Sequence, residues 1–270
     1  MYNGERYLRQ SIQSVVHQSY PNIQYIIIDG GSTDQTTKII SEFSDGVDIW
    51  KSEPDQGIYD AWNKGLRHAK GEWICFIGAD DFFLDMNVIE NLATEMGKID
   101  SQRTKYVYGS IHQISSHSGE VIDVFAYDWH CAKDRFSKEM TLAHCGAFHH
   151  RSLFERHGYF NTSFRIAGDY EFLLREYRQN KEFARFVSLP VVAMRSGGIS
   201  GTLKNRLRMA KESNLARKIN GYKGISLPIL LWIIRIWIYI IAEKALGPRA
   251  STRLADLYRI LTGKKRRWTI

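Results

Sequence analysis

The sequence predicts an α/β protein with a helical, basic tail, and three observations support this prediction. Over roughly the first hundred residues, apolar runs of strand length alternate with segments whose apolar residues recur at helical spacing. Beyond them, shorter β-like pieces indicate that a parallel sheet becomes mixed. Residues 203–270 combine 16 Lys and Arg with 3 Asp and Glu, a net charge of +13. We therefore expect a folded body over residues 1–202 and a tail over residues 203–270.

The composition excludes a disordered, fibrous or disulfide-stapled protein. Of the 270 residues, 44% are apolar, 13% aromatic and 24% charged, which is typical of a chain that buries a sizeable core. The whole chain carries +8, so the body carries −5 and the positive charge lies in the tail. Cys75, Cys131 and Cys145 are odd in number and lack metal-ligand spacing, which predicts free thiols in a reducing compartment.

The first half of the body follows a strand and helix alternation that favours parallel pairing through right-handed crossovers. Apolar residues at helical spacing mark the helices, and short apolar runs bounded by Gly, Pro or Asp mark the strands. In chain order, we expect a helix over Glu5–Ser19, a buried parallel strand over Ile23–Ile28, a helix over Thr33–Phe43 capped by Ser32 or Thr33, a strand over Asp48–Trp50, a helix over Ile58–Ala69 and a second buried strand over Trp73–Ile77.

The second half of the body is richer in short β-like pieces. A Ser118-Gly119 turn signal separates two of them. The sequence predicts strands over Tyr106–Tyr108, Ile111–Ser115, Val121–Phe125 and Phe183–Val187, with helices over Ser152–His157 and Tyr170–Gln179.

Acidic residues follow two of the predicted strands, where ligands bind in open parallel sheets. Asp80 and Asp81 could present hard oxygen ligands to Mg²⁺ or Mn²⁺, which would neutralise a leaving diphosphate. The alternative, a polar turn before a helix, is about equally well supported by the pair alone. Asp29 precedes a Gly-Gly-Ser turn; capping and a tight turn explain its neighbours but leave Asp29 itself unexplained.

A third acidic position, Asp169, stands at the entrance of a predicted helix. It is either a favourable N-terminal carboxylate or a general base that meets an acceptor hydroxyl. His144, Cys145 and His149 lie close in sequence, but a zinc site needs a fourth ligand and cleaner spacing, so we expect no metal there.

The tail contains an apolar segment over residues 225–246 that is marginal as a membrane span. A span needs about 20 apolar residues, and Arg235 at its centre costs roughly 2.5–3.5 kcal/mol. Trp232, Trp237 and Tyr239 suit an interface, and Lys264–Trp268 suits anionic lipid. We expect an interfacial or re-entrant helix at the cytoplasmic face of the cell membrane, with a spanning helix second and a packed or oligomeric helix third. No nucleic-acid-binding motif accompanies the basic residues, so we expect no nucleic-acid partner.

Together these pieces resemble the inverting family 2 glycosyltransferases of the GT-A fold, notably bacterial O-antigen, capsule and exopolysaccharide enzymes. The resemblance covers about residues 2–202, and the ordered set of motifs is specific although each piece alone is not. The matching runs are Tyr2–Leu8, Ser14–Asn22, Ile28–Asp34, Ser52–Gly65, Gly71–Trp73, Gly78–Asp81 and Phe164–Phe172.

The resemblance implies transfer of a sugar from a nucleotide-diphosphate sugar to an acceptor hydroxyl, with inversion. The acceptor would be a lipid-linked saccharide, the setting cell-surface polysaccharide biosynthesis, and the cofactor Mn²⁺ or Mg²⁺. Asp169 matches the catalytic base, and Asp80 matches the metal-binding aspartate, with Asp81 beside it. The positions that match the family's base- and ribose-binding residues are Tyr2, Asp29 and Asp55.

Two departures from the family pattern matter. Gly78 stands where the family usually has Asp, which shortens the acidic motif. The family also places a hydrophobic strand directly before the Tyr-Asn-Gly motif, whereas Met1 directly precedes Tyr2 here. We therefore expect a sheet that lacks this first, central strand, because the chain starts late relative to its gene or is truncated.

The alternative function is a catalytically inactive nucleotide-sugar-binding or scaffold protein of a polysaccharide assembly complex. A nucleotidyltransferase is disfavoured because no Gly-rich loop with a basic phosphate clamp is present.

Overall fold

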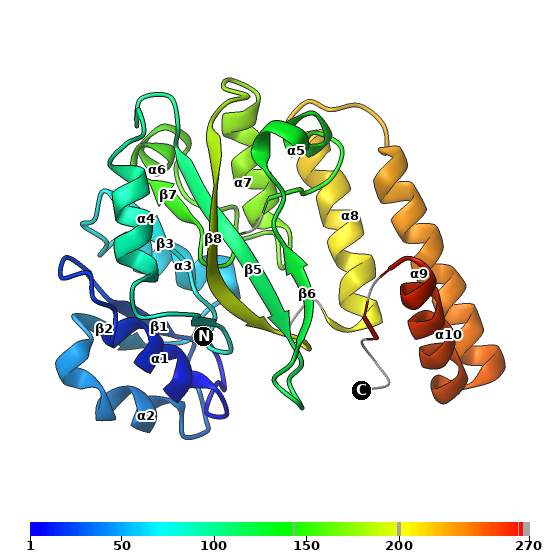
Figure 1. Cartoon of the computed structure of the whole chain (residues 1–270), viewed down its shortest axis with the longest axis horizontal. Helices are drawn as coiled ribbons and strands as arrows, with labels where there is room; N and C mark the ends of the chain where they lie inside the picture. Colours follow the sequence, from blue (N-terminus) through cyan, green and yellow to red (C-terminus); the bar gives the residue numbers. More distant parts are fainter. Residues whose placement is uncertain (143, 199–200, 264, 267–270) are drawn as a thin grey trace.

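The strands form two sheets (Figure 1) in a computed structural model that describes all residues except 143, 199–200, 264 and 267–270. The small sheet pairs β1 (Ile26–Asp29) with β2 (Ile49–Ser52) in parallel. The larger sheet has the order β3-β7-β5-β8-β4, with β6 added to β5. Its strands are β3 (Trp73–Cys75), β4 (Phe82–Phe83), β5 (Tyr106–Ile114), β6 (Val121–Phe125), β7 (Phe148–His150) and β8 (Ala184–Arg195).

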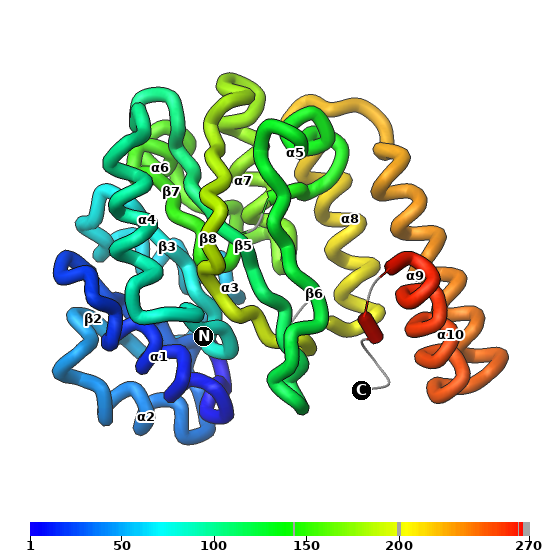
Figure 2. The backbone as a smooth tube through the Cα atoms, viewed as in Figure 1, coloured from blue at the N-terminus to red at the C-terminus, as the bar shows by residue number. Residues whose placement is uncertain are grey.

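Helices flank both sheets and form the tail. The last three, α8 to α10, lie side by side at one end of the molecule (Figure 2). Within the described residues, no helix combines the length and the apolar character needed to cross a membrane. The helices are α1 (Leu8–Val16), α2 (Thr36–Glu42), α3 (Ile58–Leu66), α4 (Val88–Met96), α5 (Trp129–Phe136), α6 (Ser152–His157), α7 (Gly168–Tyr177), α8 (Leu203–Ile219), α9 (Leu227–Leu246) and α10 (Pro248–Leu261), with a 3₁₀ turn at Ser44–Gly46.

The larger sheet is mixed, which confirms the prediction for the second half of the body. β5 runs parallel to β8 and antiparallel to β6 and β7. Alternate side chains of β5 enter different clusters: Tyr106 and Tyr108 pack with residues of α7, and Val107 and Ile111 pack with residues of α4. Both faces of this central strand are therefore covered, as is typical of a sheet inside an α/β fold.

The prediction for Trp73–Ile77 was wrong in extent and direction. β3 ends at Cys75, is half-buried and pairs antiparallel with β7, with Ile74 opposite His149. The apolar run fits an edge strand as well as a buried one, and a partner 75 positions away decides its direction. β1 and β3 belong to different sheets, and within the described residues no ladder joins the two sheets.

Helix α1 connects the two sheets through side chains. The Ser11 hydroxyl donates to the Gly78 carbonyl at 3.0 Å, and the Ser14 hydroxyl accepts from the Phe83 amide at 3.1 Å. On its other face α1 packs against β1 and α2, in a cluster of Leu8, Ile12, Ile27, Ile39, Ile40 and Val47.

The predicted cap of the second helix was also wrong. α2 begins at Thr36, and the Ser32 hydroxyl is turned to Asp29 instead. Asp34 Oδ1 accepts from the Thr36 amide at 2.9 Å, and Glu5 Oε2 accepts from the Gln35 amide at 2.9 Å. The helix therefore starts later because Asp34 closes the preceding turn.

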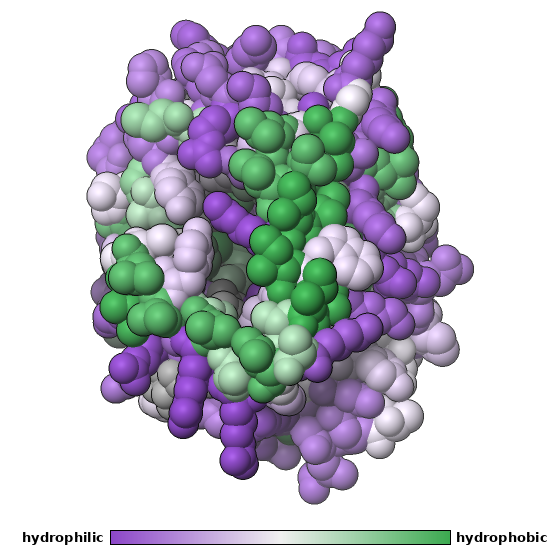
Figure 3. All heavy atoms as spheres, turned by 90° about the vertical axis from the view of Figure 1, so that its right-hand side faces the viewer, coloured by the Kyte–Doolittle hydropathy of each residue, from purple (hydrophilic) through white to green (hydrophobic). Residues whose placement is uncertain are grey.

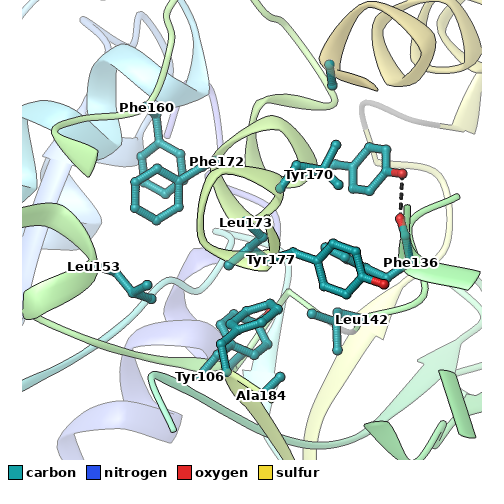
Figure 4. Packing of buried hydrophobic residues seen from close by; sticks show 14 of the residues in the cluster. Tyr106, Phe136, Leu142, Leu153, Phe160, Tyr170, Phe172, Leu173, Tyr177 and Ala184 are labelled. Atoms are coloured by element: carbon teal, nitrogen blue, oxygen red, sulfur yellow. Dashed lines mark hydrogen bonds between the residues drawn. The ribbon is translucent and has the colours of Figure 1, made fainter. Parts of the chain in front are cut away.

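The main core lies between the larger sheet and α7 (Figure 4). The Tyr170 hydroxyl reaches across it and donates to the Phe136 carbonyl at 2.6 Å. α8 belongs to the same core through Ala216, which is fully buried.

The end of the described tail contacts the body at β6. Arg259 of α10 pairs with Asp123 of β6, Nη2 to Oδ2 at 2.8 Å, and both side chains are largely buried. Lys265 Nζ donates to the Val121 carbonyl at 3.3 Å. The helical tail is thus attached to the sheet through a charged contact.

Candidate active site

Asp169 occupies the first turn of α7 and is half-buried. Its Oδ1 accepts a hydrogen bond from the Tyr59 hydroxyl of α3 at 3.2 Å. Burial raises the pKa of Asp169 from 3.8 to about 6, although hydrogen bonds from the Tyr170 amide and the Tyr59 hydroxyl lower it. A carboxylate with a pKa near 6 is ionised at neutral pH and is still basic enough to accept a proton.

Gly168 allows Tyr59 to reach Asp169. A Cβ at position 168 would lie 2.8 Å from Cε2 and 2.9 Å from Cζ of the Tyr59 ring, which is closer than side chains tolerate. Burial, and then the charge of Asp169, raise the pKa of Tyr59 well above its usual value, so its hydroxyl remains a donor. The sequence pattern assigns Tyr59 no role, although this residue lies within the motif Ser52–Gly65.

The turn before Asp169 is held by α8. Glu212 Oε2 accepts from the amides of Arg165, Ile166 and Ala167 at 3.0, 2.8 and 3.1 Å. The residues just ahead of Asp169 are therefore fixed by a carboxylate of the tail segment.

Asp80 and Asp81 lie between β3 and β4, folded against Gly78. A Cβ at position 78 would meet Asp81 Oδ2 at 2.6 Å and Asp80 Oδ1 at 3.0 Å. The glycine that departs from the family pattern is thus required by this arrangement of the pair. Asp80 Oδ2 also lies 3.4 Å from where a Cβ would stand on Gly198.

Asp81 is buried and hydrogen-bonded within the protein. Its Oδ2 accepts from the Cys145 thiol at 3.0 Å, and its Oδ1 accepts from the Arg195 amide at 3.3 Å. Burial and the neighbouring Asp80 raise the pKa of Asp81 to about 6. Cys145 and Arg195 were not predicted at this site, because 64 and 114 positions separate them from Asp81.

Arg195 ends β8 beside the acidic pair. Its guanidinium lies 4.3 Å from the centre of the Tyr7 ring and 5.3 Å from that of Phe82, and it donates to Gln10. Its Nε is buried and has no hydrogen-bond partner among the described residues. This buried donor is therefore left for a further acceptor.

Asp29 is fully buried at the carboxyl end of β1 and organises the turn that follows it. It accepts from the amides of Gly31 and Ser32 at 3.1 and 2.9 Å, and from the hydroxyls of Ser32 and Ser52. Burial opposes ionisation, but these hydrogen bonds dominate and hold the pKa of Asp29 below its ordinary value.

Asp55 lies against the same turn. A Cβ at Gly30 would meet Asp55 Oδ2 at 2.4 Å and the Met1 carbonyl at 3.2 Å, while the Gly30 amide donates to that carbonyl at 2.7 Å. Tyr2, the next residue, is 61% exposed. The structure thus brings Asp55 to the turn held by Asp29 and leaves the Tyr2 ring at the surface.

The acidic pair fits a divalent cation that is shared with a diphosphate. Its oxygens are the hard donors that Mg²⁺ and Mn²⁺ prefer, and Asp80 is half-buried, whereas both Asp81 oxygens accept protein hydrogen bonds. Among the described residues, no group of three or more His, Cys, Asp or Glu side chains could hold a metal. Asp80 is therefore better placed than Asp81 to bind a cation.

His144 and His149 are packed among aromatic rings and lie near the site. His144 stacks on Trp62 at 4.9 Å between ring centres, and His149 is fully buried. Burial lowers the pKa of His144 to about 3 and lowers that of His149 well below its usual value, so both are neutral. Nε2 of each has no hydrogen-bond partner among the described residues.

Solved structures with the same fold are GT-A glycosyltransferases, which confirms the predicted fold class. Staphylococcus aureus TarS 1–349, in complex with UDP, matches with a TM-score of 0.57 at 15% identity, over 88% of this chain and 68% of that one. The mannosyltransferase PcManGT from Pyrobaculum calidifontis, in complex with GDP-Man and Mn²⁺, matches with a TM-score of 0.59 at 19% identity, over 98% of this chain and 79% of that one.

The family follows from the sequence match. The model of "Glycosyl transferase family 2" covers residues 1–158, and the chain belongs to this family of glycosyltransferases. A PGL/p-HBAD biosynthesis glycosyltransferase of Mycobacterium bovis is 25% identical over 260 residues, 95% of this chain and 91% of the relative. An uncharacterized glycosyltransferase of Rickettsia prowazekii is 28% identical over 191 residues, 66% of this chain and 57% of the relative.

Proposed function

We propose that this glycosyltransferase moves a sugar from a nucleotide-diphosphate sugar to a hydroxyl of a lipid-linked saccharide, with inversion and with help from a divalent metal. The observation that carries the proposal is Asp169, a half-buried carboxylate with a pKa of about 6 that a tyrosine hydroxyl orients. In a single displacement it takes the proton of the acceptor hydroxyl while that oxygen attacks the anomeric carbon.

Asp80, with Asp81 behind it, is the proposed metal site. A divalent cation held there would offset negative charge on the leaving diphosphate. The Asp81 side chain is fixed next to Asp80 in the chain, because the Cys145 thiol and the Arg195 amide donate to its two oxygens.

Tyr2, Asp29 and Asp55 are the proposed nucleoside side of the site. Tyr2 is exposed, so its ring is free to stack on a base. Asp29 acts by holding the Gly30–Ser32 turn, and Asp55 lies against that turn. TarS and PcManGT, whose structures contain UDP and GDP-Man, support a nucleotide in this fold.

The mycobacterial relative supports a lipid-linked acceptor, because its name places it in PGL/p-HBAD biosynthesis. The tail supports it independently. In α9 the buried apolar residues are Ile229 and Ile236, while the opposite helix face is apolar and exposed. We call this face the α9 stripe; it comprises Leu227, Leu230, Leu231, Ile234, Ile238 and Ile241.

We propose that the α9 stripe lies in the cytoplasmic membrane surface and makes residues 203–270 a peripheral tail on the body of residues 1–202. A helix with one face packed and the other apolar suits an interface better than water. Arg235 and Lys244 of α9 and Arg249 of α10 are exposed and add positive charge to the same tail. Of the predicted basic run Lys264–Trp268, only Lys265 and Arg266 lie within the described residues, and both are exposed.

Calorimetric titration of UDP and of GDP, each with Mn²⁺ and with EDTA, tests the donor side. We expect one nucleotide to bind at least about tenfold more tightly with Mn²⁺. Equal affinity in Mn²⁺ and EDTA would contradict the metal site.

A transfer assay with the matching nucleotide sugars and lipid-linked saccharides then separates the enzyme from its alternative. A catalytically inactive donor-binding or scaffold protein would bind nucleotide and transfer nothing. Product with inverted anomeric configuration supports the proposal, and retained configuration would contradict it.

Flotation with liposomes tests the tail. We expect the full chain to float with vesicles that contain anionic lipid, and Ile234→Asp/Ile238→Asp to stay in the soluble fraction. The matched control is Val124→Asp, a similarly exposed apolar residue on β6. Identical flotation of the stripe variant and the parent would remove the membrane role.

A further inference from the structure

An apolar groove runs between α9, α8 and the segment that follows α5. It encloses about 610 Å³, which is within the usual range for small-molecule sites. Figure 3 shows the hydrophobic band on this end of the molecule and a hollow beside it. The groove is lined by Arg135, Glu139 and Met140, by Met209 and Ser213 of α8, and by Leu227, Pro228, Ile229, Leu231, Trp232 and Arg235 of α9.

We propose that this groove holds the hydrocarbon chain of a single anionic lipid, with the lipid phosphate at Arg235. The inference rests on the proposed function, because it identifies the lipid carrier of the acceptor as a phosphate-bearing, single-chain amphiphile and gives it a place on the enzyme.

The charges of the groove favour an anion. Arg135 and Glu139 pair with each other, Nε to Oε1 at 3.0 Å, so these two charges cancel. Arg235 is exposed and has no hydrogen-bond or ion-pair partner among the described residues. One guanidinium above an apolar floor matches an amphiphile with an anionic head, because arginine binds phosphate oxygens with two parallel hydrogen bonds.

The groove is continuous with the proposed membrane face. Leu227 and Leu231 line the groove and also belong to the α9 stripe. If the stripe lies in the bilayer surface, a lipid chain reaches the groove without crossing water, so its transfer costs little hydrophobic free energy.

One wall of the groove is fixed to the helix that carries the base. The Phe136 carbonyl accepts from Tyr170, the residue after Asp169, and the Ser137 carbonyl accepts from Arg217 Nε at 2.8 Å. Ser226, the N-cap of α9, donates to the Lys138 carbonyl. The segment of residues 136–140 therefore ties α7, α8 and α9 together, and a lipid in the groove has a fixed position relative to Asp169.

Binding of dodecyl phosphate below its micellar concentration tests the inference on the full chain. We expect Met209→Trp, which fills the groove, to weaken binding at least about tenfold. Arg235→Gln should weaken the binding of dodecyl phosphate by a similar factor and leave the binding of dodecyl maltoside unchanged, because only the phosphate contacts the guanidinium. The control Val124→Gln, at an exposed apolar residue of β6 outside both the groove and the α9 stripe, should bind like the parent.

Met140→Trp fills the groove from the opposite wall and serves if Met209→Trp does not fold. Equal binding by a folded filled variant and the parent, or no binding by the parent, would overturn the inference. UDP titration of the same variants separates the two proposals: unchanged, metal-dependent UDP binding with lost lipid binding supports the groove. If the filled variants keep UDP binding, transfer and lipid binding alike, the proposed function stands and the lipid site in the groove is refuted.

Discussion

The hydroxyl of Tyr59 donates to Oδ1 of Asp169 at 3.2 Å across 110 positions of sequence. This bond joins α3, which follows the turn at Asp55, to α7, which begins beside the base. It helps to stabilise the ionised form of a carboxylate whose burial otherwise favours protonation. Orientation and basicity of Asp169 therefore depend on the same hydroxyl.

Replacing the base should separate chemistry from donor binding. We expect Asp169→Asn to lower transfer by about 10²–10⁴-fold, because the amide cannot accept the acceptor's proton. Nucleotide affinity, measured by titration with Mn²⁺, should stay within about twofold. The control is Asp134→Asn on the exposed face of α5. Full transfer by the Asp169 variant would refute its role.

The rate should depend on the ionisation of Asp169. With its pKa at about 6, transfer should fall to half near pH 6 and by about tenfold for each unit below. Tyr59→Phe removes a hydrogen bond that lowers the pKa of Asp169, so the acidic limb of the pH–rate profile should move to higher pH. Tyr159→Phe, at an exposed ring, should leave the limb in place. An unmoved limb in Tyr59→Phe would argue against the coupling.

The same raised pKa affects stability with a definite sign. Between about pH 4 and pH 6 the folded state binds more protons at Asp169 than the unfolded state, so this group makes the protein less stable as pH rises through that range. We expect the unfolding free energy of Asp169→Asn to increase relative to that of the parent as pH rises from about 4 to 6, which denaturant titrations at several pH values can measure. A parallel curve for parent and variant would contradict the assignment.

Adding one methyl group at Gly168 should misplace Tyr59. The new Cβ would lie 2.8 Å from the ring, and we expect Gly168→Ala to cost about 1–3 kcal/mol of unfolding free energy and to reduce transfer. Gly97→Ala is the matched control, because its nearest contact would be 3.5 Å. Thermal denaturation and the transfer assay measure both effects, and wild-type values in Gly168→Ala would show that the ring is free to move.

Gly78→Ala should disturb the acidic pair selectively. Its Cβ would press on Asp81 Oδ2 at 2.6 Å, so we expect Mn²⁺-dependent UDP or GDP affinity to fall about tenfold, with the affinity in EDTA unchanged. Gly65→Ala, whose Cβ would make an ordinary 3.6 Å contact, is the control. Unaltered metal dependence in Gly78→Ala would mean that the pair does not hold the metal.

Much of the fold was predictable because its elements are local patterns. Helix α6 matched the predicted Ser152–His157, and β6 matched Val121–Phe125. Helix α5 was missed although Asp128 caps it, accepting from the His130 amide at 2.7 Å. Three of the four residues that follow Ala132 in this helix are charged, which obscured the helical spacing of its apolar residues. β4 has only two residues, too few for any periodicity.

The candidate site was predictable only in its motif residues. Asp80, Asp81 and Asp169 stand in recognisable runs, whereas the groups that set their properties, such as Tyr59 and Cys145, come from distant elements. Such contacts depend on tertiary packing, which spacing along the chain does not encode. The predicted parallel direction of β3 was wrong for the same reason.

The division of the strands into two sheets has a thermodynamic consequence. The small sheet with α1 and α2 encloses its own apolar cluster and shares no ladder with the larger sheet in the described chain. Such a unit can open locally at a lower free energy than global unfolding requires. It carries Asp29, whereas Asp80 and Asp169 belong to the other unit. A nucleotide sugar that touches both would rigidify their junction, so donor occupancy should appear as slowed amide hydrogen exchange in α1 and β1.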